Sequence, residues 1–348
     1  MKNSAHPYGW AATKIQQEDA WEIETGNPNL LVGILDSGID ANHPELSGKI
    51  HGDHSKNFVS DGKSALTDYV GHGTHVAGII AAKYNNDYLN FCGVCQSVKL
   101  VSLRVADGGL KMRNEDFAAA VNYAQQKNIP LLNISLEFTN TVDSSVLRAI
   151  ENYKGLMVWA AGNRSLDYDE AGGGPVYWDD TSIIVVGAST STDTKYSGSN
   201  FGEETVDIFA PGAPILSSYP QSLCSSTNCS SAYHSRYGYH YMSGTSQATP
   251  FITGVAALIM SRHPSISPAE IKEVIIGSAD EVAALVGHCA SNGRLNAYSA
   301  LSSPLLHADV DYDWSNYDKH WVRCQDCDYQ WLEDHILHPA LGSCLICN

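Results

Sequence analysis

A serine, a histidine and an aspartate stand in three short segments that suit proton transfer and nucleophilic attack. Ser246 lies in the segment Gly244–Pro250, directly before an apolar, helix-like run that starts at Phe251. Unpaired N–H groups and the positive dipole end at the start of a helix stabilise negative charge there. A serine alone at such a position is more often an ordinary helix N-cap. The assignment of Ser246 as a nucleophile therefore requires a base and a carboxylate elsewhere in the chain.

His72 and Asp36 supply those two groups. His72 stands between two glycines at the start of another apolar helix-like run, where we expect its imidazole to be exposed. Asp36 directly follows an apolar, strand-like run. An attacking hydroxyl needs an imidazole to accept its proton and a carboxylate to orient that imidazole. His72 and His75 could instead hold a metal, but no acidic third ligand is spaced to join them.

The oxyanion that forms during attack on a carbonyl needs hydrogen-bond donors. Asn163 follows the apolar run Leu156–Ala161 and Gly162, and it offers a side-chain amide. A single well-placed amide donor of this kind accelerates acyl transfer strongly. We therefore add Asn163 to the candidate site.

The elements that must position these residues alternate between strand-like and helix-like patterns. Buried apolar runs separated by helices predict an α/β fold, a three-layer sandwich with a mostly parallel central sheet. Functional groups then gather beyond the carboxyl ends of the strands. The segment Pro211–Tyr241, rich in Ser, Tyr and Gly, is predicted to be a surface loop. The expected strands are 30–35, 98–105, 129–136, 156–161 and 183–188; the expected helices are 72–83, 114–127, 144–154, 249–263 and 267–277.

Five segments, from about Tyr8 to Leu301, resemble the subtilisin (subtilase) family in that family's order. They read ILDSGIDANHPEL, GHGTHVAG, AAGN, VDIFAPG and GTSQATP. The resemblance implies a serine endopeptidase that cleaves extended polypeptides through an acyl-enzyme intermediate. It assigns orientation of the imidazole to Asp36, general base and then acid to His72, attack to Ser246, and the oxyanion hole to Asn163 with the backbone N–H of Ser246.

The resemblance also implies a substrate-binding strand and a primary specificity pocket, in which backbone bonds hold the peptide and pockets select side chains. Glu137 stands where the family usually has a glycine. Its carboxylate is expected either to favour basic residues beside the scissile bond or to be a solvated side chain without a role. The residues assigned to substrate binding are Ser135, Leu136, Glu137, Ala160, Ala161 and Gly162.

Calcium is a further ligand that the resemblance implies. Glu45 and the stretch Asn85–Asp87 match the family's oxygen donors, a chemistry that calcium accepts. The loop that follows is longer than usual and contains Cys92. The site is therefore either present, remodelled or absent.

The last 46 residues carry a separate signal. Residues 303–348 hold eight Asp and Glu against two Lys and Arg, so we place a domain boundary between a peptidase domain, 1–302, and a C-terminal module, 303–348. Two C-x-x-C pairs sixteen residues apart fit a zinc ribbon, although two disulfides would also use them. Four thiolates would fill all four positions of a structural zinc ion. The predicted ligands are Cys324, Cys327, Cys344 and Cys347.

Composition limits the partners. The net charge of −17 argues against nucleic acid, and no apolar run is long enough for a membrane span. The N-terminus has no apolar leader-like stretch, which favours the cytoplasm, with secretion of a processed form as the alternative. Nine cysteines, an odd number, leave the redox compartment open. Protein or peptide substrates are the expected partners, and a separate pro-segment or inhibitor is possible.

Two rival functions remain at this stage. The first is a non-catalytic peptide-binding protein that kept the fold, against which a complete set of catalytic residues speaks. The second is a zinc-dependent regulatory module in which peptide cleavage is secondary. Turnover tests the first, and removal of residues 303–348 tests the second.

Overall fold

The computed structural model describes residues 9–84, 92–139, 141–170, 180–224, 238–307, 310–313, 319–324 and 330–334. The chain divides into two compact units, Met1–Leu301 and Ser302–Asn348. Each unit is described by itself.

The first unit is built on one large, mostly parallel sheet. Its nine strands are joined by eight pairings. All of these are parallel except the pairing of β12 with β13 at one edge. The predicted mostly parallel sheet is confirmed. Its order is β12 (Asp280–Glu281), β13 (Gly293–Arg294), β9 (Ile208–Ala213), β8 (Ile183–Thr190), β7 (Leu156–Ala160), β5 (Leu131–Ile134), β1 (Leu31–Asp36), β3 (Lys99–Arg104) and β2 (Lys56–Asn57).

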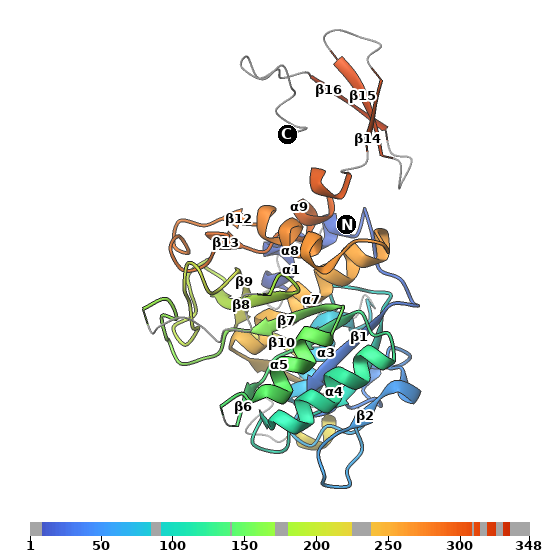
Figure 1. Cartoon of the computed structure of the whole chain (residues 1–348), viewed down its shortest axis with the longest axis vertical. Helices are drawn as coiled ribbons and strands as arrows, with labels where there is room; N and C mark the ends of the chain where they lie inside the picture. The colour runs from blue at the N-terminus through green and yellow to red at the C-terminus, as the bar shows by residue number, and fades with distance from the viewer. Residues whose placement is uncertain are drawn as a thin grey trace. The chain divides into compact units, whose positions relative to one another are not determined.

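Helices cover both faces of this sheet. In Figure 1, α4 and α5 lie in front of the strands, whereas α7 lies behind them. Helix α3 packs against α7, which also contacts four strands of the sheet. Strands covered on both faces are buried throughout, as β5 and β7 are, and β7 is apolar along its whole length. The helices are α1 (Trp10–Lys14), α2 (Gln17–Ala20), α3 (His72–Ala81), α4 (Asn114–Gln126), α5 (Ser144–Asn152), α7 (Thr245–Arg262), α8 (Pro268–Gly277) and α9 (Ala297–Leu301).

The prediction of a surface loop over 211–241 is wrong at both ends of this segment, whereas residues 225–237 lie outside the described residues. Its first residues belong to β9, and β10 (Ile215–Ser218), which is buried, pairs with the partly buried β11 (Tyr239–Met242) in an antiparallel ribbon. The serines are compatible with burial because their hydroxyls are satisfied by helix α3: Ser217 donates to the carbonyl of His75 at 2.6 Å and Ser218 to that of Thr74 at 2.9 Å. Composition alone misled here, since hydrogen-bonded serines pack well.

Two short strands lie beside the expected substrate region. They are β4 (Lys111–Met112) and β6 (Glu137–Phe138), which pair in parallel with Lys111 opposite Glu137. Within the ranges that the structure covers, no helix combines the length and the apolar character that a bilayer crossing requires.

The second unit contains a three-stranded antiparallel sheet in the order β14 (Val310–Asp313), β15 (Lys319–Cys324) and β16 (Gln330–Asp334), preceded by a 3₁₀ turn at Pro304–His307. Cys324 is the last residue of β15. The other three predicted zinc ligands, Cys327, Cys344 and Cys347, lie outside the described residues. The zinc assignment therefore stays a prediction.

Candidate active site

The candidate catalytic residues all stand at ends of elements. Asp36 is the last residue of β1, His72 the first of α3 and Ser246 the second of α7, while Asn163 follows β7 by three residues. Strands β1 and β7 flank β5 and run parallel, so their carboxyl ends open on the same edge of the sheet.

Asp36 and His72 form a direct contact. Nδ1 of His72 lies 2.8 Å from Oδ1 of Asp36 and 3.0 Å from Oδ2. The carboxylate can accept the Nδ1–H only if the imidazole carries its proton there, which leaves Nε2 free to act as a base. The prediction that His72 is exposed is wrong: its side chain is 7% exposed, because the whole of α3 is buried.

A second buried carboxylate, Asp68, stands behind this pair. One oxygen accepts bonds from the hydroxyl of Ser37 at 2.9 Å and from the backbone N–H groups of Val70 and Gly71. The other accepts from the backbone and hydroxyl of Thr74 at 2.8 and 2.7 Å. Asp68 thus joins the loop before His72 to the turn after Asp36.

The protonation of His72 is set by opposing effects. Burial lowers the pKa of the imidazole, but the charge and hydrogen bond of Asp36 and the charge of Asp68 outweigh burial, so the pKa is raised overall. A raised pKa favours the imidazolium that forms when His72 accepts a proton. That is the property a general base needs during attack.

The hydroxyl of Ser246 donates to the backbone carbonyl of Ser135 at 2.9 Å. Among the described contacts it has no hydrogen bond to His72. Attack by this hydroxyl would require it to exchange the bond to Ser135 for one to the imidazole. Catalytic hydrogen bonds often tighten only when substrate is bound.

The side chain of Asn163 is held by its oxygen. Oδ1 accepts from the backbone N–H of Thr245 at 2.9 Å. Gly244 permits this approach, because a Cβ at that position would lie 2.9 Å from the same oxygen. With Oδ1 fixed, Nδ2 remains as a donor beside the first turn of α7, whose N–H at Ser246 has no partner within the helix.

The six residues predicted to bind substrate lie on two neighbouring segments. Ser135–Glu137 follows β5 and enters β6, and Ala160–Gly162 leaves β7, the neighbour of β5 in the sheet. Glu137 lies beside Gly162, since a Cβ built on Gly162 would meet Oε1 of Glu137 at 2.9 Å. Gly162 has a φ of +96°, so a larger residue there would be strained as well as crowded.

His75 belongs to no group of three or more possible metal ligands among the described residues. It is fully buried, and its Nε2 lies 3.2 Å from the carbonyl of Ile215 and 3.1 Å from that of His240. Burial and the neighbouring His72 lower the pKa of His75 to about 3. Its ring therefore stays neutral and ties α3 to strands β10 and β11.

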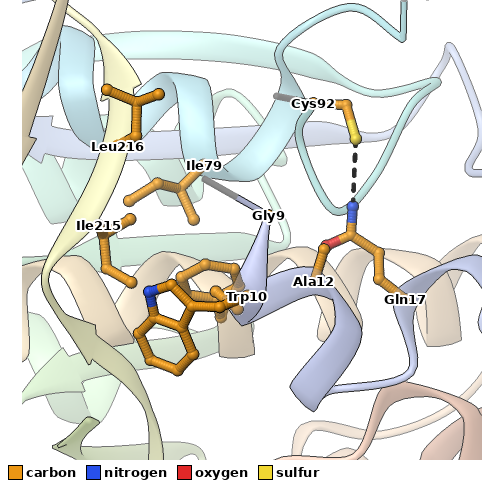
Figure 2. Close-up of a pocket in the computed structure, with 10 residues that line it drawn as sticks. Gly9, Trp10, Ala12, Gln17, Ile79, Cys92, Ile215 and Leu216 are labelled. Atoms are coloured by element: carbon orange, nitrogen blue, oxygen red, sulfur yellow. Dashed lines mark hydrogen bonds between the residues drawn. The ribbon is translucent and has the colours of Figure 1, made fainter. Parts of the chain in front are cut away.

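Cys92 and Cys95, which form a third C-x-x-C pair, lie away from these residues. Nε2 of Gln17 approaches the sulfur of Cys92 at 3.5 Å beside a small, largely apolar cavity of about 30 Å³ (Figure 2). Both thiols are free, and burial raises the pKa of each to about 12. They remain protonated and are poor nucleophiles and metal ligands.

The predicted calcium donors are only partly described. Glu45 is buried, and one carboxylate oxygen accepts the hydroxyl of Tyr239 at 2.5 Å. Residues 85–87 lie outside the described residues. The described residues contain no group of three or more His, Cys, Asp or Glu side chains placed to hold a metal ion.

The sequence did not predict the residues that hold Asp36 and His72 in place. Asp68 stands four residues before His72 and Ser37 directly after Asp36, so proximity to the motifs was the available signal. Arg104, a fully buried arginine at the end of β3, gave no signal beyond its place in an apolar run.

Known proteins resemble this chain in sequence and in fold. The sequence profile of the subtilase family matches residues 27–300. Thermitase of Thermoactinomyces vulgaris is 34% identical over 305 residues, which are 86% of this chain and 96% of thermitase. Subtilisin DY of Bacillus licheniformis is 32% identical over 281 residues, 78% of this chain and 91% of that protein.

Two solved structures have a similar fold. A cold-adapted subtilisin-like serine proteinase, 29% identical, superposes with a TM-score of 0.61 over 77% of this chain and 89% of its own. A lanthipeptide protease, 24% identical, shares the fold with a TM-score of 0.71 over 85% and 94%. The chain belongs to the subtilase family, and it is a subtilisin-like serine endopeptidase.

Proposed function

We propose that Asp36, His72, Ser246 and Asn163 are the catalytic residues of this peptidase. The observation that carries the assignment is the hydrogen bond of 2.8 Å between Asp36 and Nδ1 of His72, which directs Nε2 away from the carboxylate. Ser246 supplies the hydroxyl at the start of α7. Asn163 and the N–H of Ser246 supply two donors for the oxyanion.

The reaction follows from these roles. Nε2 of His72 takes the hydroxyl proton as Oγ of Ser246 attacks the scissile carbonyl, and Asp36 stabilises the imidazolium that forms. The negative oxygen of the tetrahedral intermediate accepts bonds from Nδ2 of Asn163 and the backbone of Ser246. His72 then gives its proton to the leaving amine. A water molecule, deprotonated by His72, releases the acyl group and restores the hydroxyl.

The substrate we propose is an extended polypeptide. It would add as a strand beside Ser135–Glu137, where backbone bonds give affinity and the walls at Ala160–Gly162 receive a side chain. The approach of Glu137 to Gly162 brings a carboxylate to this pocket. We propose that it favours lysine and arginine there.

Cleavage of casein tests the assignment. The wild-type protein should hydrolyse casein and lose activity on reaction with a serine-directed phosphonate, whereas Ser246→Ala should do neither. Ser243→Ala, three residues earlier and exposed, is the matched control and should behave as wild type. If casein is bound but never cleaved by the wild type, the non-catalytic peptide-binding function is correct instead.

Two metal sites are part of the proposal. The Cys spacing of residues 324–347 supports a structural zinc ion, which would stabilise the C-terminal unit rather than act in catalysis. Calcium would bind through Glu45 together with oxygen donors of the stretch Asn85–Asp87, which follows the helix that begins at His72. Both sites are tested by elemental analysis of the purified protein and by its thermal midpoint with and without a chelator. Deletion of residues 303–348 should abolish zinc binding and leave casein cleavage unchanged.

We propose secretion, the alternative to a cytoplasmic location. Cys224 is disulfide-bonded, which is typical of oxidising compartments. One relative, 29% identical over 72% of this chain, is a cell wall-associated protease of Bacillus subtilis. Fractionation of the producing cells, with detection of the protein in the medium, tests the location.

A further inference from the structure

A buried arginine lies directly behind the proposed catalytic aspartate. Arg104 ends β3 and stands opposite Asp36 in the register of β1 and β3. Its side chain is only 1% exposed. A guanidinium removed from water is costly unless its N–H groups are bonded.

The outer side of the guanidinium is held by a loop. Nη1 and Nη2 donate to the two carboxylate oxygens of Asp61 at 2.8 and 2.7 Å, a bidentate pair. Nη1 also donates to Oδ1 of Asn57 at 3.0 Å. Hydrogen bonds from Arg104 lower the pKa of Asp61 far below its ordinary value, so this carboxylate stays charged.

The inner side of the guanidinium reaches the residue after Asp36. Nε donates to the carbonyl oxygen of Ser37 at 3.1 Å. The N–H of Ser37 donates to Oδ1 of Asp36 at 2.7 Å, the same oxygen that contacts His72. The hydroxyl of Ser37 donates to Asp68 and accepts the N–H of Gly73 at 3.1 Å. Ser37 is therefore fixed at its amide, hydroxyl and carbonyl.

We infer that Arg104 is a positioning residue for the Asp36–His72 pair. Asp61 fixes the guanidinium, the guanidinium fixes the carbonyl of Ser37, and the amide of Ser37 holds the Asp36 carboxylate in the orientation that meets the imidazole. The inference rests on the catalytic roles proposed above. A misplacement of about 1 Å at a reacting group costs on the order of 100-fold in rate.

A purely structural role for Arg104 would have a different signature. Loss of a buried ion pair would lower the thermal midpoint and the fraction of active molecules, but each active molecule would keep its rate. Loss of positioning lowers kcat for each active site. It also moves the acid limb of the pH profile, because the charges of Asp36 and Asp68 raise the pKa of His72. His75, the other titratable group beside His72, stays neutral.

The experiment compares Arg104→Lys and Arg104→Met with Arg294→Lys. Arg294 is the matched control: it is 5% exposed and is bonded to Asp193 and Asp280, both at 2.9 Å. It lies on β13, the strand next to the edge strand β12 and distant from β3 in the sheet. Active sites are counted with a serine-directed phosphonate. The kinetic substrate is a short chromogenic peptide, and each thermal midpoint is recorded.

We expect Arg104→Lys to lower kcat per active site by about 10-fold and Arg104→Met by about 100-fold, with little change in KM. The acid midpoint should move to lower pH, because a misaligned Asp36 supports the imidazolium less. Arg294→Lys should lower only the thermal midpoint. Asp61→Asn, on the accessible side of the pair, replaces any Arg104 variant that does not fold and should show both kinetic effects.

Unchanged kcat per active site and an unchanged acid midpoint in the Arg104 variants, with a lowered thermal midpoint, would overturn the inference. Ser246→Ala in the same assay separates this result from failure of the proposed function. If that variant still cleaves the peptide, the catalytic assignment itself is wrong. If it is inactive while the Arg104 variants match wild type, only the positioning role is lost.

Discussion

Ser246 and Ser135 hold one another through two reciprocal hydrogen bonds. The hydroxyl of Ser246 donates to the carbonyl of Ser135 at 2.9 Å, and the hydroxyl of Ser135 donates to the carbonyl of Ser246 at 3.0 Å. The second bond is part of a buried chain, since Nδ2 of Asn133 donates to the same Ser135 hydroxyl at 2.9 Å. The proposed nucleophile is thus hydrogen-bonded to the segment proposed to bind substrate.

Ser135→Ala should destabilise the protein. It leaves the amide of Asn133 and the carbonyl of Ser246 without this partner, and an unsatisfied buried polar group costs about 1–3 kcal/mol. The free energy of unfolding, measured in urea, should fall by about that amount. The backbone carbonyl of residue 135 is unaffected, so the segment proposed to bind peptide should persist. An unchanged unfolding midpoint would show that the chain of hydrogen bonds contributes nothing.

Asn163→Ala should lower kcat by about 10²–10³-fold, the loss typical of removing one oxyanion donor. KM should change little, because the bond forms only as charge develops on the oxygen. Gly244→Ala should act in the same direction, since its Cβ would displace the Asn163 side chain. Steady-state kinetics on one peptide substrate measure both parameters. A rise in KM as large as the fall in kcat would contradict the assignment.

Asp68→Asn should shift the acid limb of kcat/KM to lower pH. His72 acts as a base only when neutral, so activity rises as pH passes its pKa, which the charge of Asp68 helps to raise. Removal of that charge lowers the pKa and moves the midpoint down. Thr74→Val is the control: it removes one hydrogen bond to Asp68 but keeps the charge, and its midpoint should equal that of wild type.

Glu137→Gln should weaken discrimination between basic and acidic side chains beside the scissile bond. A partly exposed ion pair is worth up to about 1 kcal/mol, so the ratio of kcat/KM for lysine over glutamate substrates should fall by about twofold to fivefold. Glu151→Gln, an exposed glutamate on α5, should leave the ratio unchanged. A wild-type enzyme that cleaves after lysine and glutamate equally well would refute the role of Glu137.

The sequence by itself determined the five central strands of the sheet (β1, β3, β5, β7 and β8), the five longer helices and the family, but not the outer strands β2, β9, β12 and β13. Apolar runs such as residues 156–161 must be buried, and their alternation with amphipathic segments predicts the sheet and its helices within a few residues. Motifs around Asp36, His72 and Ser246 are local, so their chemistry is visible without a structure. The same reasoning failed for Ser217 and Ser218, because their burial depends on carbonyl groups of α3 far along the chain.

Only the tertiary structure decided how the site is supported. Asp61, Arg104 and Ser37 come from three separate segments, and nothing in the spacing of their residue types predicts that they form one hydrogen-bonded chain behind Asp36. The burial of His72 and the resting bond of Ser246 to Ser135 likewise depend on packing between distant elements. Residue types limit which chemistry is possible, whereas hydrogen-bond geometry between segments exists only once the chain has folded.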